Sequence, residues 1–146
     1  MADNVFFRGE RPVRGMAFVG GGAAVLFALI RSAELALGIQ IPDDGLTLQN
    51  TVLEAPIKEE GLFRLLPLIL IAASKNHPAA LAVGAAWSSF GFTAYHGLDD
   101  WFSPRFYQNM IGGAVFFGVA HTRGVSHSWA AHTGWNASAY AASQLF

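Results

Sequence analysis

Residues 55–74 run APIKEEGLFRLLPLILIAAS, and this stretch decides the fold. Its length of about 20 residues is what a helix needs to cross the apolar core of a bilayer. Pro56 suits the first turn of such a helix, whereas Pro67 lies inside it, deprives the carbonyl of Phe63 of its donor and should kink the helix. The stretch also carries charged side chains, namely Lys58, Glu59, Glu60 and Arg64. Charges are expensive in hydrocarbon, so a membrane helix that keeps them is predicted to use them.

The composition of the whole chain agrees with a lipid environment. Of its 146 residues, 53% are hydrophobic and only 13% are charged, whereas soluble domains typically carry about 25% charged residues. The net charge of −1 provides no basic face, so we expect no nucleic-acid partner. The chain has no cysteine, which excludes thiolate catalysis, cysteine-ligated zinc and disulfide bonds.

Four other helical segments are predicted around this stretch. They cover residues 16–37, residues 79–97, residues 104 to about 120, and residues 126 to the C-terminus. Ser103-Pro104 opens the third of them, because serine is a good N-cap and proline suits the first helical position. Loops are expected at residues 38–51, 75–78, 98–103 and 121–124. A cleaved signal peptide is the alternative for the first segment, but no small-residue cleavage site follows it cleanly.

These segments predict an all-α protein, a multi-span transmembrane bundle of about five helices. We expect one membrane-embedded domain over residues 1–146, with the N-terminal arm, first span and loop in residues 1–54 and the helical core in residues 55–146. The loop Lys and Arg residues divide unequally between the two sides of the bilayer. One side holds Arg8, Arg11, Arg14, Lys75 and Arg123, and the other holds mainly Arg105. The positive-inside rule then places the N-terminus in the cytoplasm, in a prokaryotic-type cell membrane.

The charged cluster contains one carboxylate that has no obvious partner. Glu60 and Arg64 stand at i, i+4 with the acid N-terminal, which is the favourable order for a helical ion pair. Glu59 is left over and is a candidate general base. Taken alone, residues 59–64 could equally form a buried ion-pair network with only a structural role.

Two other helices repeat a four-residue spacing of polar groups. His96 lies four residues after Phe92, so the ring can support the imidazole on the same helix face. His132 and Asn136 present two neutral hydrogen-bonding groups on one face, as the stabilisation of an oxyanion requires. A lone histidine is more often a core or interfacial residue, and His132 with Asn136 could simply join neighbouring helices.

Together these motifs resemble those of the CAAX-prenyl-protease and bacteriocin-processing family, the type II CAAX endopeptidases. Residues 59–64 match its motif of two glutamates, three residues and an arginine, and Ala55-Pro56 before them is also similar. Residues 92–96 match phenylalanine, three residues and histidine, and residues 132–136 match histidine, three residues and asparagine. All three motifs occur in the family's order, each on a predicted helix.

The resemblance implies an intramembrane endopeptidase that cleaves a peptide or membrane-protein substrate. Glu59, helped by His96, would activate a water that attacks the peptide carbonyl. His132 and Asn136 would donate to the tetrahedral oxyanion. Structural support of the site would fall to Glu60, Arg64 and Phe92. The family commonly has more spans than five, so substrate-entry helices are reduced here or a homo-oligomer replaces them.

The resemblance leaves the cofactor open, because members are also described as metalloproteases. One glutamate with two histidines is a legitimate zinc set, here Glu59, His96 and His132. We favour a metal-free mechanism without a cofactor, because His132 is paired with Asn136, whose amide suits an oxyanion hole better than a coordination shell.

Helix depth poses an objection to a shared site. Counted at 1.5 Å per residue from the predicted span ends, Glu59 lies about 24 Å deep, against about 9 Å for His132 and about 15 Å for Asn136. About 9 Å or more must be recovered by helix tilt, by the Pro67 kink or by a water-filled cavity.

Two other functions compete with the protease. A non-catalytic membrane binding or bacteriocin-immunity protein could use the same polar pocket, and a small transporter could use Glu59 and His96 as a proton relay. Several further side chains have structural interpretations only. His121 and His127 are expected in loops near the interface, and the expected aromatic belt consists of Trp87, Trp101, Trp129 and Tyr107. Residues 20–22 and 112–113 are glycines that predict close helix packing.

Overall fold

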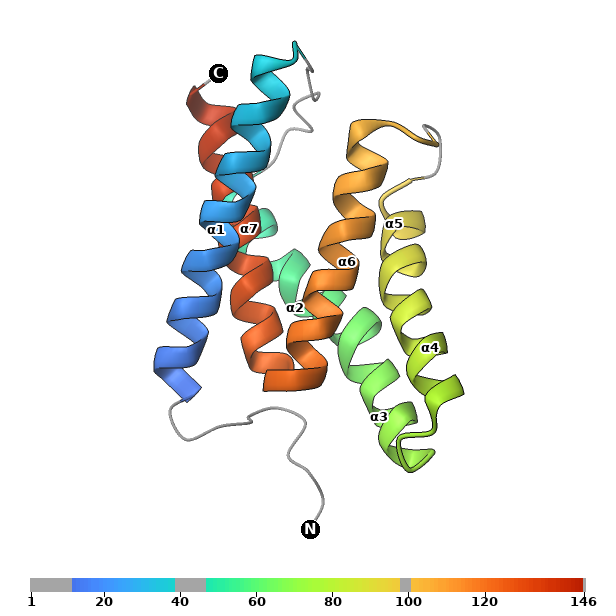
Figure 1. The fold of residues 1–146 in the computed structure, drawn as a ribbon. Helices are drawn as coiled ribbons and strands as arrows, with labels where there is room; N and C mark the ends of the chain where they lie inside the picture. Colours follow the sequence, from blue (N-terminus) through green and yellow to red (C-terminus); the bar gives the residue numbers. More distant parts are fainter. Residues whose placement is uncertain (1–11, 39–46, 98–100, 146) are drawn as a thin grey trace.

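The structure is a computed structural model that describes residues 12–38, 47–97 and 101–145. Within these ranges the chain is all-helical and forms five helical runs, as predicted (Figure 1). The first, fourth and fifth runs are single helices, α1 (Pro12–Ala36), α6 (Pro104–Arg123) and α7 (Val125–Leu145). The second run joins η1 (Asn50–Glu54), α2 (Ala55–Glu60), η2 (Gly61–Leu65) and α3 (Leu66–Ala73). The third joins α4 (Pro78–Ala86), η3 (Trp87–Gly91) and α5 (Phe92–Tyr95).

The segments named η are π-helical turns, in which the backbone ladder widens from i, i+4 to i, i+5. Such turns are rare and occur frequently at functional sites. Here η2 directly follows Glu59 and Glu60, and it ends two residues before Pro67. The second turn of interest, η3, ends immediately before Phe92. Both irregular turns therefore border the predicted motifs.

Some helix ends differ from the prediction. The fourth helix continues to Arg123 instead of about residue 120, and Gly124 makes the reversal into α7 at a φ of 97°, a conformation that favours glycine. His121 therefore lies in the last turn of α6, and His127 lies in the first turn of α7 with only 2% of its surface exposed. The expectation that these two histidines occupy interfacial loops was wrong.

The helices approach closely where glycines face a neighbouring backbone. A Cβ atom added to Gly20 of α1 would lie 2.8 Å from the carbonyl oxygen of Ala130 on α7, and one added to Gly134 of α7 would meet the backbone of Gly20. A Cβ atom at Gly113 of α6 would lie 2.5 Å from the carbonyl oxygen of Ser88 in η3. Close packing at Gly20 and Gly113 is thus confirmed, as small residues in membrane helix interfaces suggest.

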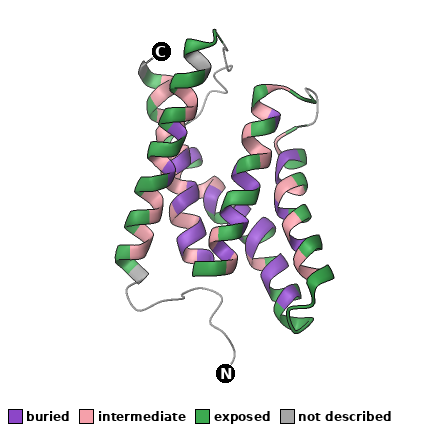
Figure 2. Ribbon diagram, viewed as in Figure 1, coloured by how far each residue is buried: buried purple, intermediate pink, exposed green. Residues whose placement is uncertain are grey.

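Buried residues gather on the facing sides of α2, α6 and α7, and exposed residues cover the outward sides of α1 and α4 (Figure 2). One apolar core joins α1 to α6 and α7. Its buried members are Ala23, Phe27, Phe116, Ala131 and Trp135. A second core packs α3 against α6 and the start of α7. The α6–α7 hairpin is therefore common to both cores.

The outward side of α1 carries large apolar side chains. Val13, Phe18, Val25 and Leu29 are each more than 60% exposed. Among the described residues, α1 is the one helix long and apolar enough, by length and composition, to cross a membrane, over Val13–Ala33. Its inner side packs on α7, so α1 belongs to the bundle.

Candidate active site

The two glutamates of α2 meet His132 of α7 between the helices. Glu60 Oε1 lies 3.0 Å from Nδ1 of His132, and Glu59 Oε2 lies 3.2 Å from Nε2 of the same ring. All three side chains are at most 6% exposed. The imidazole of His132 is therefore held between two carboxylates.

The contact between Glu59 and His132 removes the depth objection. The second run is already helical at Leu48, before the predicted start at residue 55, so Glu59 lies near its middle and not near its end. Figure 1 shows α2 passing obliquely behind α7 and α6, with α3 continuing the run beside α4. The predicted loop over residues 38–51 is correspondingly shorter, and residues 39–46 lie outside the described part of the chain.

His96 approaches Glu59 from the other side, at the C-terminal end of α5. Its Nε2 lies 3.5 Å from Glu59 Oε1, and its Nδ1 lies 2.9 Å from the carbonyl oxygen of Phe92. A carbonyl can only accept, so Nδ1 of His96 donates to it, and Nε2 is the ring nitrogen that faces Glu59. His96 is also 25% exposed, so this side of the site is the accessible one.

Arg64 lies fully buried beneath the carboxylates. Its Nε is 3.5 Å from Glu60 Oε1, which confirms the predicted i, i+4 pair. The guanidinium carbon lies 4.5 Å from the ring centroid of Phe92 and 5.3 Å from that of Phe116, so two aromatic faces flank the charge. Arg64 thereby holds a fixed positive charge next to Glu60.

Phe92 and Phe116 form the aromatic walls around the histidines. The centroid of Phe92 lies 4.5 Å from that of His96 and 5.6 Å from that of His132, so its ring contacts both imidazoles. Phe116 of α6 stacks on His132 with centroids 4.6 Å apart and an interplanar angle of 21°. Trp135 and Phe27 continue this row of rings towards α1, at 6.1 Å and 5.0 Å. The orientation of His132 thus depends on packing as well as on hydrogen bonds.

Asn136 lies one turn beyond His132 on α7, and its amide is engaged elsewhere. Its Nδ2 donates to the carbonyl oxygen of Thr51 in η1 at 2.9 Å. This hydrogen bond uses one of the two amide hydrogens of Asn136 and leaves the other for a further acceptor. Thr51, 6% exposed, is therefore the residue that orients Asn136.

Sequence reasoning missed several contributors to the site. Thr51 and Phe116 belong to no motif, and only their places in the folded bundle bring them to the site. Trp87 was expected in an interfacial belt, but it lies in η3, and its indole Nε1 donates to the carbonyl oxygen of Leu62 at 3.2 Å. Trp87 is 47% exposed, and its place in an aromatic belt stays a prediction.

The charges of the buried cluster balance when the cluster holds one proton. Glu59 and Glu60 contribute two negative charges and Arg64 contributes one positive charge. A proton on His132 supplies the second positive charge and gives each ring nitrogen an N–H group facing one of the carboxylates.

The three candidate zinc ligands, Glu59, His96 and His132, lie next to one another. Within residues 12–38, 47–97 and 101–145, no group of three or more histidine, aspartate or glutamate side chains is disposed to hold a metal ion. The two ring nitrogens of His132 are directed at Glu59 and Glu60. The zinc set of Glu59, His96 and His132 stays a prediction, and we derive no step through a metal.

Two glutamates, an arginine and two histidines thus meet around one buried point of an all-helical bundle. The profile of the family described as Type II CAAX prenyl endopeptidase Rce1-like matches residues 43–138. The matched stretch covers well over half of the chain, and the chain belongs to this family. Neither the curated proteins nor the solved structures give a match. The family resemblance of the motifs is thereby confirmed, and the protein belongs to a family of membrane-embedded proteases, which act on peptides.

Proposed function

We propose that the protein is an intramembrane endopeptidase that hydrolyses a peptide bond with a water molecule activated by Glu59. The observation that carries the proposal is the convergence of Glu59, His96 and His132, from three separate helical runs, with 3.5 Å and 3.2 Å between the carboxylate oxygens and the two Nε2 atoms. Burial of polar groups is costly, and a single shared reaction explains why three helices accept the cost at the same place.

The first step is the attack of the water on the peptide carbonyl. Glu59 Oε1 accepts one hydrogen of the water, helped by the lone pair at Nε2 of His96. The water oxygen forms a bond to the carbonyl carbon, and the carbonyl oxygen becomes an oxyanion. The proposed donors to this oxyanion are the second amide hydrogen of Asn136 and Nε2–H of His132, which turns from Glu59 to the oxyanion once the proton of the water has neutralised the Glu59 carboxylate.

The second step is the departure of the amine. The protonated Glu59 returns its proton to the leaving nitrogen as the carbon–nitrogen bond breaks, which releases a carboxylic acid and an amine. Glu60 and Arg64 do not exchange protons with the substrate. They fix the position and charge of His132 through the contacts of 3.0 Å and 3.5 Å that link the three side chains.

The proposal is tested by Glu59→Gln and His96→Ala in a peptide-cleavage assay with purified protein. Both variants are expected to lose at least about 100-fold in kcat, because general base catalysis contributes roughly 10² to 10⁴. The matched control is Glu54→Gln, which changes an exposed glutamate of the same helical run and should leave kcat unchanged.

Several outcomes would contradict the proposal. Full activity of Glu59→Gln would show that Glu59 is not the general base. An inactive Glu59→Gln protein that binds or protects as well as the parent would favour the binding or immunity function. A parent activity that is lost on chelation and restored by zinc would contradict the metal-free mechanism.

A further inference from the structure

The indole of Trp87 contacts the helical run that carries Glu59 and Glu60. Its Nε1 donates to the carbonyl oxygen of Leu62 at 3.2 Å, and the two residues are 25 positions apart in the chain. Both residues lie in π-helical turns, Leu62 in η2 and Trp87 in η3. The bond therefore links the two irregular turns that border the site.

The carbonyl of Leu62 needs a donor from outside its own helix. The amide of Leu66 donates to Gly61, as the i, i+5 pattern of η2 requires. The next amide in that pattern belongs to residue 67, which is proline and has no N–H. Water cannot replace this donor inside a bilayer. A backbone carbonyl left without a hydrogen bond there costs on the order of several kcal/mol. The indole N–H of Trp87 supplies the missing donor.

The turn that Trp87 stabilises sets the position of the charged cluster. Glu59 and Glu60 lie directly before η2, and Arg64 lies within it. Phe63, also within η2, is 2% exposed and packs edge-on against Phe92 at 5.7 Å. A return of η2 to a regular α-helical ladder would rotate the residues before it against those after it.

We propose that Trp87 is a positioning residue of the active site. Its N–H replaces the hydrogen-bond donor that Pro67 lacks, and in doing so it holds η2 in the widened form that places Glu59 and Glu60 against His132. The effect on catalysis rests on the proposed function, whereas the effect on stability does not.

The proposal is tested by a double-mutant cycle of Trp87→Phe and Pro67→Ala. Trp87→Phe keeps an aromatic ring but removes the indole N–H together with part of the ring, so it should lower the Tm of the detergent-solubilised protein, and the cycle with Pro67→Ala separates the hydrogen bond from the lost packing. In the Pro67→Ala background the backbone has a donor at residue 67, and the same Trp87→Phe change should shift the Tm much less. The matched control is Trp101→Phe, because Trp101 is 54% exposed and Trp87 is 47% exposed, and it should shift the Tm little in either background.

The catalytic readout separates positioning from a general loss of fold. In the parent background Trp87→Phe should lower kcat by about tenfold, the worth of one such hydrogen bond, and leave KM within about twofold. In the Pro67→Ala background its effect on kcat should fall to about twofold or less. Equal Tm losses in both backgrounds, or no loss in either, would overturn the proposal. An inactive parent protein with the expected Tm cycle would instead contradict the proposed function and leave Trp87 in its structural role.

Discussion

Two ion pairs of the second helical run differ in burial and in almost nothing else. Glu60–Arg64 and Glu54–Lys58 have the same i, i+4 spacing and the same nitrogen–oxygen distance of 3.5 Å. The side chains of the first pair are at most 3% exposed, and those of the second are 71% and 42% exposed. Removal of one partner from a buried pair leaves an unpaired charge, whereas exposed pairs contribute little.

Arg64→Met is therefore expected to destabilise the protein by about 3–5 kcal/mol, because it leaves two buried carboxylates with one positive charge fewer. Lys58→Met, the matched control, should change the free energy of unfolding by less than about 1 kcal/mol. Denaturant unfolding of both variants in detergent measures the difference. Equal stabilities would show that Glu60 does not need the guanidinium.

Single residues were predictable where the relevant spacing lies within one helix. The Glu60–Arg64 pair and the contact of Phe92 with His96 follow from the i, i+4 rule, and the structure contains both. The hydrogen bond from His132 to Glu60 spans 72 positions and depends on how two helices cross, which no local pattern specifies. The roles of Glu59, His96, His132 and Asn136 in catalysis stay predictions.

At the scale of elements, the contact of α1 with α7 depends on the absence of side chains. Gly134 faces the backbone of Gly20, whereas a Cβ added to Gly21 or Gly22 would meet nothing within 4 Å. Alanine should therefore destabilise the protein at Gly134, where there is no room for a Cβ atom, and should be tolerated at Gly21, where there is room.

Gly134→Ala should force α1 and α7 apart and cost about 1–3 kcal/mol, the usual range for an overpacked interface. Gly21→Ala should be neutral or slightly stabilising, because alanine favours helix and has room. Thermal unfolding in detergent distinguishes the two. A Gly134→Ala protein as stable as Gly21→Ala would mean that α1 is not tightly packed on α7.

The five helices were predictable because each apolar run is long and has turn residues at its ends, so several local signals agree on each helix. The π-helical turns were not, since only Pro67 hinted at an irregular ladder, and it predicted a kink and not the widening over residues 61–65. The early start of the second run was also missed. Its first turns are held by tertiary contacts such as the bond from Asn136 to Thr51, which sequence patterns do not contain.

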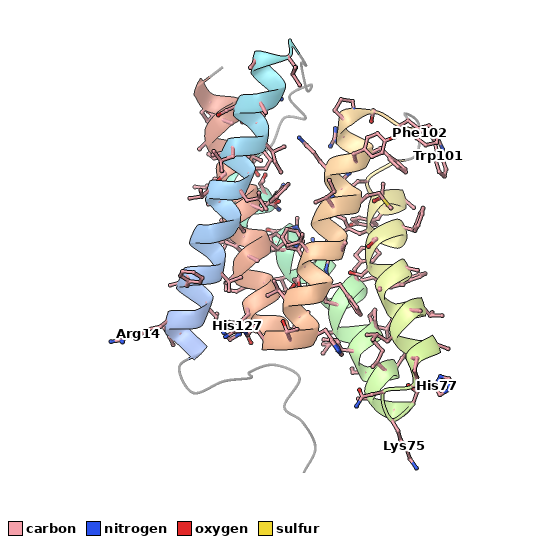
Figure 3. All side chains as sticks on the ribbon, viewed as in Figure 1. Arg14, Lys75, His77, Trp101, Phe102 and His127 are labelled. Carbon is pink, nitrogen blue, oxygen red and sulfur yellow. The ribbon has the colours of Figure 1, made fainter. Side chains whose placement is uncertain are left out.

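For the whole molecule, basic and aromatic residues mark opposite ends. Figure 3 shows Arg14 and Lys75 at the end where α1 begins, and Trp101 and Phe102 at the other end. This agrees with the division of positive charge that the sequence predicts, although Arg8 and Arg11 lie outside the described residues. We propose that the end bearing Arg14 and Lys75 faces the cytoplasm.

The absence of cysteine makes this orientation measurable without background labelling. In sealed right-side-out vesicles, Lys75→Cys should resist a membrane-impermeant thiol reagent until the vesicles are opened. Trp101→Cys, at the opposite end, should react at once. The reverse pattern would invert the proposed orientation. This experiment does not bear on the single-domain and homo-oligomer expectations, which stay predictions.

A row of ring contacts connects α1 to the candidate active site. It runs from Phe27 through Trp135 and Phe116 to His132. No motif residue lies on α1, so a minimal enzyme trimmed to residues 55–146 would keep every reacting group. It would nevertheless lose Phe27, which packs edge-on against Trp135, and we expect the imidazole of His132 to be held less firmly against Glu59. We therefore expect α1 to be needed for full activity, although it carries no motif residue.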